Sequence, residues 1–238
     1  MNKPKIVILS GAGISAESGI PTFRDSNGLW ENYKIEDVAT PEGWRKNKGL
    51  VLDFYNQRRR DAKNCQPNAG HIGLVELEEK YDVTIVTQNV DNLHEKAGST
   101  NVIHLHGNLF QSRSTLNPKV IYDCEGDINI GDKCELGSQL RPHIVWFKED
   151  VPEIHNSIKY FEECDIAIII GTSLQVYPAA GLLDYIHYLK PVYLLDPSDN
   201  TLTDFSHFKH IKENVSSGIK ILLEELLSDD FVIYKPLL

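Results

Sequence analysis

The feature that most constrains the fold of this chain is a series of short apolar runs rich in β-branched residues. They span residues 6–9, 83–86, 102–105, 166–170 and 192–195. Runs that are apolar on both faces are typical of buried parallel strands. Helical patterns lie between or after these runs, at residues 68–81 (with Asn68 as the N-cap), 179–190 and 216–227. Strands that alternate with helices predict an α/β fold, specifically a Rossmann-type doubly wound parallel sheet.

Two segments interrupt this alternation. Residues 31–67 are mostly helical in pattern with a break at Pro41, and residues 110–140 are polar and rich in Asp, Gly and Ser. We expect these two insertions to form a smaller lobe beside the sheet. The whole chain, residues 1–238, is then one domain, and its large lobe takes approximately residues 1–30, 68–109 and 141–238.

Composition narrows the class of protein. The 238 residues carry a formal net charge of −10, which disfavours nonspecific attraction to nucleic acid or to an anionic membrane. No apolar run is long enough for a secretory signal or a membrane-spanning helix. The four cysteines form no CxxC pair, which argues against a disulfide framework: Cys65, Cys124, Cys134 and Cys164. We expect a cytoplasmic monomer with no nucleic-acid or membrane partner.

A glycine-rich turn follows the first apolar run directly. Gly11, Gly13 and Ala16 match the G-x-G-x-x-A spacing that lets a backbone approach a pyrophosphate at a helix N-terminus. The alternative is a tight strand-to-helix turn without a ligand. An ordinary dehydrogenase would add an acidic residue about 20 residues later, at the end of a second strand. The chain instead continues as "IPTFRD", which argues against that class of enzyme.

Polar side chains follow two further predicted strands. Gln88, Asn89 and Asp91 come after residues 83–86, where open α/β sheets bind ligands, although the Asn and Asp would equally serve as caps of the next helix. His104 and His106 lie two apart on a predicted strand, hence on one face. A metal pair there would need a third ligand that the sequence does not identify. His106, beside a glycine, is well placed for acid–base chemistry near neutral pH.

Together with "LRPHIVWF" at residues 140–147 and "GTSLQVYPAA" at residues 171–180, these stretches resemble the sirtuins, the NAD-dependent protein lysine deacylases. The resemblance runs from about Val7 to the last helix. It implies a Rossmann-type large domain with a small lobe made from two insertions. It also implies that NAD is consumed: the acyl-lysine oxygen attacks C1′ of the nicotinamide ribose, nicotinamide leaves, and the acyl group ends on ADP-ribose.

The resemblance also assigns roles to residues. The catalytic base is His106, and the catalytic set is completed by Asn89 and Asp91. A flexible loop over the cofactor carries Phe23, Arg24 and Asp25, and the ring of Phe23 keeps water from the reactive ribose. The remaining cofactor-binding residues are Gly11, Ala12, Gly13, Ala16, Gln88, Gly171, Thr172 and Ser173.

Two groups of residues are expected to contact an acylated peptide. Val145, Trp146 and Phe147 on one side, and the segment from Leu174 to Val176 on the other, would flank it as strand partners. Tyr55 and Arg58 lie three apart in a helical pattern and so share a face. In sirtuins that prefer succinyl- or malonyl-lysine, a Tyr-x-x-Arg pair at this place binds the distal carboxylate. The alternative is that Arg58, Arg59 and Arg60 form a solvated basic face.

The chain departs from the family pattern in three places. The interval that usually holds four zinc-binding cysteines offers only Cys124 and Cys134, with Ser114 where a first cysteine would fall. We therefore expect no structural zinc, with hydrogen bonds and packing in its place. Lys148 stands where the family usually has Gly. The family's ribose-binding Asn falls at Leu194, so Asp196 or Ser198 would have to reach the adenosine ribose.

Other functions would use the same pocket. An NAD glycohydrolase or an ADP-ribosyltransferase would need no acyl-lysine, and the peptide-flanking stretches favour the deacylase over both. A non-catalytic NAD-binding sensor is a third class, which the retained His106, Asn89 and Asp91 disfavour.

Overall fold

The computed structural model describes residues 3–22, 29–199, 202 and 204–233. Phe23, Arg24 and Asp25 lie outside the described residues, so their expected role at the cofactor stays a prediction. Two short elements lie between the longer ones, α2 (Ile35–Val38) and the 3₁₀ turn η1 (Leu77–Glu79).

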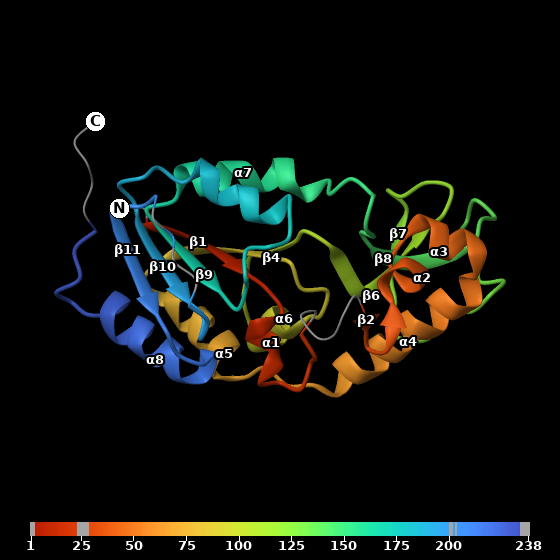
Figure 1. Ribbon diagram of the computed structural model, residues 1–238, viewed down its shortest axis with the longest axis horizontal. Coiled ribbons are helices and arrows are strands. Elements are labelled where there is room, and N and C mark those ends of the chain that lie inside the picture. Colours follow the sequence, from red (N-terminus) through yellow and green to blue (C-terminus); the bar gives the residue numbers. More distant parts are fainter. Residues whose placement is uncertain (1–2, 23–28, 200–201, 203, 234–238) are drawn as a thin grey trace.

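A six-stranded, all-parallel sheet forms the centre of the large lobe (Figure 1). Its strands are β1 (Lys5–Ser10), β4 (Asp82–Thr87), β5 (Val102–His104), β9 (Ile166–Ile170), β10 (Pro191–Leu195) and β11 (His207–Ile211). Their order across the sheet is β11-β10-β9-β1-β4-β5, the Rossmann order, so the predicted fold class is confirmed. Strand order reverses between β1 and β9, and ligands bind outside the carboxyl ends of strands at such a point.

Both faces of the sheet are covered by helices (Figure 1). On one face lie α5 (Ala69–Glu76) and α8 (Val215–Leu226), and Ile219, Leu222 and Leu226 of α8 are buried against the sheet as the sequence predicts. On the other lie α7 (Glu153–Glu163) and the 3₁₀ helix η2 (Ala179–Tyr185). The α-helix expected over residues 179–190 is therefore wrong in type and length. Gly181 within it lowers the helix propensity of this segment.

A smaller lobe lies at one end of the large sheet, and its elements come from two stretches of the chain that overlap the predicted insertions (Figure 1). The first contributes a hairpin of β2 (Leu29–Trp30) and β3 (Tyr33–Lys34), then α3 (Pro41–Lys46) and α4 (Lys48–Asn64). Pro41 does not only break a helix: it begins α3, with Thr40 as the N-cap. The second contributes a separate antiparallel sheet of β6 (Gly107–Ser114), β7 (Ile121–Asp123) and β8 (Leu140–Ile144). The lobe boundaries named above stay a prediction.

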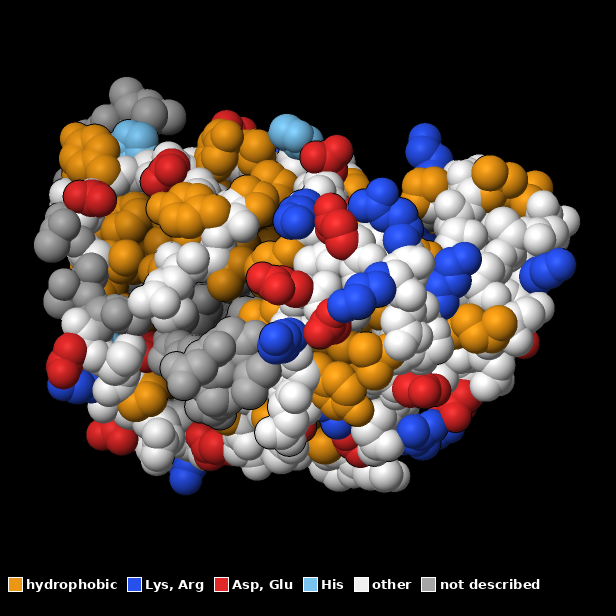
Figure 2. Space-filling model, turned by 45° about the vertical axis from the view of Figure 1, so that its right-hand side comes forward, with side chains coloured by type: hydrophobic (Ala, Val, Ile, Leu, Met, Phe, Trp, Pro, Cys, Tyr) orange, Lys and Arg blue, Asp and Glu red, His pale blue; other side chains and the backbone are white. Residues whose placement is uncertain are grey.

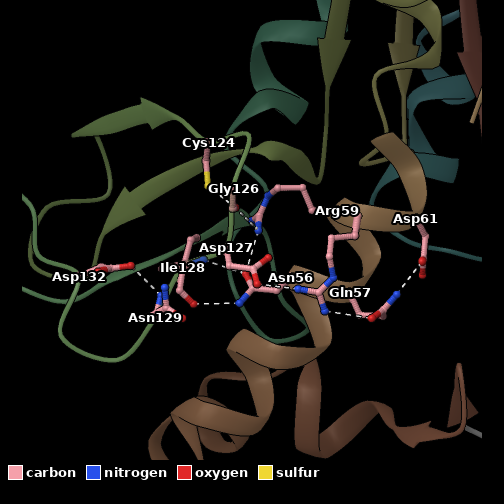
Figure 3. A network of polar contacts seen from close by, with 11 residues as sticks. Asn56, Gln57, Arg59, Asp61, Cys124, Gly126, Asp127, Ile128, Asn129 and Asp132 are labelled. Atoms are coloured by element: carbon pink, nitrogen blue, oxygen red, sulfur yellow. Dashed lines mark hydrogen bonds and ion pairs between the residues drawn. The ribbon is translucent and has the colours of Figure 1, made fainter. Parts of the chain in front are cut away.

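Side chains of α4 fasten the irregular part of the second insertion (Figure 3). The amide of Asn56 donates to the carbonyl of Ile128 at 3.0 Å and accepts from its N–H at 2.9 Å. The fully buried guanidinium of Arg59 donates to the carbonyls of Leu109 and Gly126. Two buried side chains of α4 thus provide hydrogen-bond partners for a loop that has little regular structure of its own.

A second polar cluster lies where the family resemblance would place zinc. Ser114 and Ser138 hydroxyl oxygens are 2.9 Å apart, and the sulfur of Cys134 lies 3.3 Å and 3.1 Å from them. These hydrogen bonds, first that with Ser114, lower the pKa of Cys134 to about 7. In the described part of the chain, no group of three or more His, Cys, Asp or Glu could hold a metal ion. The absence of zinc itself stays a prediction.

Two further observations concern the surface. Within the residues described, no helix is both long and apolar enough to cross a membrane. On the face drawn in Figure 2, Lys and Arg side chains lie interspersed with Asp and Glu, so the described positive charges there are balanced locally.

Candidate active site

Two loops meet at the point where strand order reverses. The first follows β1 and begins the short helix α1 (Gly13–Ala16), and the second follows β9. The N–H of Gly13 donates to the carbonyl of Gly171 at 2.8 Å. Gly171 has φ +62°, and a Cβ on it would overlap the backbone N of Ile14, so only glycine fits. The predicted cofactor residues of the two loops are thereby brought together: Gly11, Ala12, Gly13 and Ala16 with Gly171, Thr172 and Ser173.

A third loop, after β4, joins them through side chains. Gln88 Nε2 donates to Thr172 Oγ1 at 3.1 Å. Ser15 Oγ accepts from Asn89 Nδ2 at 3.2 Å and donates to Asp91 Oδ2 at 3.0 Å. The structure therefore places Gln88, Asn89 and Asp91 around one edge of the sheet. Asn89 and Asp91 are almost fully buried.

Asp91 serves two purposes at once. Its Oδ1 accepts from the N–H of Leu93, the first residue of α6 (Leu93–Ala97), at 3.0 Å. The N-cap position is Asn92, whose side chain makes no capping bond, and the side chain of Asn89 bonds Ser15, so of the two predicted caps only Asp91 bonds the start of the helix. Its Oδ2 faces Ser15 in the site. Burial raises the pKa of the Asp91 carboxyl, and the bonds from Leu93 and Ser15 oppose that shift.

Sequence reasoning missed the buried polar residues behind this loop. Ser15 links Asn89 to Asp91, and His71 lies 3.5 Å from Ser15 and contacts the ring of His94 edge-on, with 5.0 Å between ring centres. His94 in turn bonds Ser10 at 2.9 Å. Burial lowers the pKa of both histidines, to about 4 for His71, so both rings are neutral. The sequence signal that could have identified these residues is a polar side chain at a helix position where the periodic pattern expects an apolar residue facing the core.

His106 is arranged as a proton acceptor. Its Nδ1 lies 3.0 Å from the carbonyl of Gln88; because a carbonyl only accepts, Nδ1 carries the proton and Nε2 keeps its lone pair. Burial lowers the pKa of His106, so the ring is neutral at pH 7. Gly107 follows with φ +84°, and a Cβ there would overlap the carbonyl oxygen of His143. His106 lies in the turn between β5 and β6, not on a strand as expected.

His104 has a different role. Its Nδ1 lies 2.9 Å from the carbonyl of Asn89 and its Nε2 2.7 Å from Oε1 of Glu95. Burial alone would lower the pKa of His104, but the hydrogen bond and charge of Glu95, the carbonyl of Asn89 and the charge of Asp91 together outweigh it, and the pKa is raised. Both of its nitrogens are engaged by the protein, which leaves none for a metal.

The residues expected at the adenosine ribose lie at the end of β10. Asp196 is buried, and its Oδ1 accepts from the N–H of Ser198 at 2.9 Å and from its hydroxyl. Leu194, where the family's Asn would fall, is fully buried in the strand. A carboxylate and a hydroxyl therefore lie together at the position that the sequence suggested.

The expected peptide-flanking stretches lie outside regular strands. The N–H groups of Val145, Trp146 and Phe147 donate to the carbonyl of His106, the carboxylate of Glu149 and the carbonyl of Ala39, respectively. On the other side, the N–H of Leu174 donates to Thr172 Oγ1 and that of Ala180 to the carbonyl of Val176.

The two residues expected at the acyl group have different surroundings. Tyr55 is fully buried, and its hydroxyl accepts from Trp146 Nε1 at 3.1 Å. Arg58 is partly buried and forms ion pairs with Glu31 and Asp61. The side chain of Arg58 is thus already paired with carboxylates of the protein itself.

The donor set at the carboxyl ends of the strands suits a ligand that carries ribose and phosphate. It combines backbone at a helix N-terminus with amides, hydroxyls and a carboxylate, from Gln88, Asn89, Thr172 and Asp196. The buried Oδ1 of Asn92 also lacks a hydrogen-bond partner among the described residues, and such an atom can accept a bond from a ligand. These residues fit NAD.

Comparisons with known proteins agree. The model of the Sir2 family matches residues 11–178. A protein of Bacteroides thetaiotaomicron named NAD-dependent protein deacylase is 49% identical over 228 residues, 93% of this chain and 97% of the relative. A protein of the same name from Helicobacter pylori is 50% identical over 222 residues, with the same coverage of 93% and 97%.

Solved structures show the same architecture. A Sir2 homologue in complex with NAD has a TM-score of 0.83 and 36% identity, covering 94% of this chain and 90% of that one. A Sir2 protein bound to acetylated peptide has a TM-score of 0.76 and 26% identity, with 93% of each chain covered. Since the family model covers most of the chain and relatives at about half identity span nearly all of it, this protein belongs to the Sir2 family.

Proposed function

We propose that this chain is an NAD-dependent protein lysine deacylase, which releases nicotinamide and O-acyl-ADP-ribose. The observation that carries the proposal is the neutral His106, with its proton on Nδ1 and its lone pair on Nε2, at the same sheet edge as Asn89 and Asp91. Relatives at about half identity that span nearly all of the chain bear the name of this activity.

The residues of the site have different roles in this reaction. NAD, when bound, supplies the ADP-ribosyl group that accepts the acyl group. His106 accepts a proton at Nε2, and the Gln88 carbonyl keeps the ring oriented for this. Ser15 holds Asn89 and Asp91 in fixed positions, so they bind a ligand without reorganising. We assign NAD binding to these residues, to the two glycine-containing loops, and to Asp196 and Ser198.

The acyl preference is the finer part of the proposal. We infer that the enzyme removes acetyl groups and also succinyl or malonyl groups, with Arg58 as the group that binds the distal carboxylate and Tyr55 beside it in the helix. Support comes from Arg58 itself, which is only 17% exposed and already pairs with carboxylates. A guanidinium in such a site binds a carboxylate through charge-assisted hydrogen bonds.

The test measures nicotinamide release from NAD with and without acetylated and succinylated peptides. Peptide-dependent release is expected for the wild type. His106→Ala should lower turnover by about a hundred- to ten-thousandfold, the usual contribution of general base catalysis, while NAD still binds. His155→Ala, an exposed histidine on α7, is the matched control and should keep its rate. Arg58→Met should lose succinyl activity far more than acetyl activity.

Each other outcome has a meaning. Equal nicotinamide release with and without peptide would indicate a glycohydrolase or an ADP-ribosyltransferase, and no release at all would indicate a sensor. Wild-type turnover in His106→Ala would reject the assigned base. Equal loss of both peptide activities in Arg58→Met would reject only the acyl preference.

A further inference from the structure

The guanidinium of Arg58 already forms ion pairs with carboxylates of the protein itself. Oε2 of Glu31 lies 3.3 Å from Nη1 of Arg58, and Oδ2 of Asp61 lies 2.8 Å from its Nη2. Both side chains of the Glu31 pair are largely shielded, at 17% exposed for Arg58 and 24% for Glu31. The guanidinium also lies over the ring of Phe54, 5.4 Å from its centre.

Glu31 is held close to Arg58 by the fold of the first insertion. It lies in the two-residue turn between β2 and β3, where Glu31 and Asn32 both have positive φ, as in a type I′ hairpin turn. The hairpin packs on α4 through aromatic rings: Trp30 and Tyr33 contact Phe54 edge-on, at 4.9 Å and 5.4 Å between ring centres. Because the hairpin is seated in this way, the Glu31 carboxylate stays at a high effective concentration near Arg58.

An incoming acyl carboxylate must compete with the two carboxylates that already pair with Arg58. Arg58 contributes one positive charge, and Glu31 and Asp61 two negative ones. A third carboxylate can bind Arg58 well only if one of the two leaves. Asp61 is the better held, because its contact is shorter and Gln57 Nε2 also donates to it at 2.7 Å. Among the described contacts Glu31 pairs only with Arg58, at 3.3 Å, so Glu31 is the one to be displaced.

We propose that Glu31 is a built-in competitor for Arg58 and sets the preference of this enzyme between neutral and acidic acyl groups. The inference rests on the proposed role of Arg58 in binding the acyl carboxylate. An acetyl group leaves the Glu31–Arg58 pair intact. A succinyl or malonyl group must displace Glu31, and the cost of that displacement lowers the apparent affinity for the acidic acyl-lysine.

The test compares kcat/KM for succinyl- and acetyl-peptides of the same sequence. Glu31→Gln keeps the size of the side chain and removes its charge. It should raise the succinyl-to-acetyl ratio about fivefold, mainly through a lower KM for the succinyl-peptide, since a partly exposed ion pair contributes about 1 kcal/mol. Asp53→Asn is the matched control: it removes an exposed negative charge from the same helix, and the ratio should change less than about twofold, because among the described contacts Asp53 makes none with Arg58.

A fall in the ratio for Glu31→Gln would show that Glu31 positions Arg58 instead of competing for it, and an unchanged ratio would show no role in selection. Either result overturns the proposal. Arg58→Met separates this from the parent hypothesis. If Arg58→Met loses succinyl activity while Glu31→Gln behaves as wild type, only the competitor role fails. If Arg58→Met keeps its succinyl-to-acetyl ratio, both proposals fail.

Discussion

His104 and His106 are two residues apart, yet the protein gives them opposite protonation behaviour. Each ring bonds through Nδ1 to a backbone carbonyl of the same loop, at Asn89 and Gln88 respectively. The difference lies at Nε2, which meets Glu95 in His104. The pKa of His104 is raised by this carboxylate, and burial lowers the pKa of His106. The first ring is thereby suited to holding the loop and the second to accepting a proton.

The His104–Glu95 pair should make stability depend on pH. The pKa of His104 is raised above 6.5, so its contribution is complete below that value and is lost as pH rises through the folded-state pKa. The pKa of Glu95 is lowered below 4.5, so its contribution is lost only as pH falls through the folded-state value. His104→Gln should therefore cost roughly 1 to 3 kcal/mol near pH 6 and less near pH 9, measured by urea unfolding. Glu95→Gln should show the same trend; a constant difference across this range would contradict the pair.

Lys148 illustrates a departure that a single dihedral angle explains. Its φ is +70°, in the left-handed region, where a side chain costs about 1 to 2 kcal/mol relative to glycine. The usual glycine of the family is thus accounted for by backbone conformation. In this chain the lysine side chain extends into solvent and its Nζ lies 3.6 Å from Glu42, an exposed pair of little energetic consequence.

At the scale of elements, hydrogen bonds from α4 side chains hold the irregular segment of the small lobe in place. Asn56 satisfies both backbone groups of Ile128, and Arg59 reaches two further carbonyls, so one helix organises a segment with few strands (Figure 3). Ile128 is itself buried in the core of this lobe. The hydrogen bonds and the apolar contact therefore depend on each other.

Asn56→Ala should destabilise the protein by about 2 to 4 kcal/mol, because it leaves the N–H and carbonyl of Ile128 without partners inside the protein. Chemical denaturation followed by tryptophan fluorescence measures the effect, since Trp44 and Trp146 lie in the same core. Gln57→Ala, one residue along on the exposed side of α4, is the control and should change stability by less than about 0.5 kcal/mol. Equal effects of the two substitutions would mean that the hydrogen bonds between Asn56 and Ile128 contribute nothing to stability.

For the whole molecule, the small lobe should keep its structure without metal. The Ser114–Cys134–Ser138 cluster and the bond from Asn56 of α4 to Ile128 supply hydrogen bonds between the segments of this lobe. Protein purified without chelator should contain well below about one zinc per chain, and dialysis against EDTA should leave the unfolding midpoint unchanged within about 1 °C. Stoichiometric zinc, or unfolding by the chelator, would show that ligands have been overlooked.

The site exists only because distant segments converge on one edge of the sheet. The loops after β1, β4, β9 and β10 start far apart in the chain, and parallel pairing brings their carboxyl ends together (Figure 1). The small lobe lies at one end of this sheet and carries Arg58, Tyr55 and Glu31. In the proposed mechanism, acyl selection thus belongs to the first insertion and NAD binding to the carboxyl ends of the sheet strands.

Much of this architecture follows from sequence pattern alone. The buried parallel strands were predictable because residues apolar on both faces have few other uses, as at Ile166–Ile170. Edge strand β11 was not, because His207, Lys209 and His210 leave it only two apolar residues and no continuous apolar run. The roles of Ser15 and His71 could not be predicted either, since Ser15 contacts Asn89 and Asp91, and His71 contacts Ser15, only when the chain is folded.

The three consecutive arginines show where the limit lies. The sequence determined that Arg58, Arg59 and Arg60 belong to one helix, whose residues advance by about 100° each and so point in different directions. Only the tertiary structure decided their fates: Arg59 is buried against the carbonyls of the second insertion, Arg60 pairs with Asp127 at the surface, and Arg58 meets Glu31. A helical pattern is local and can be read from neighbours in the chain. The environment of a charged side chain depends on which remote segment packs against it, and that is settled by the fold as a whole.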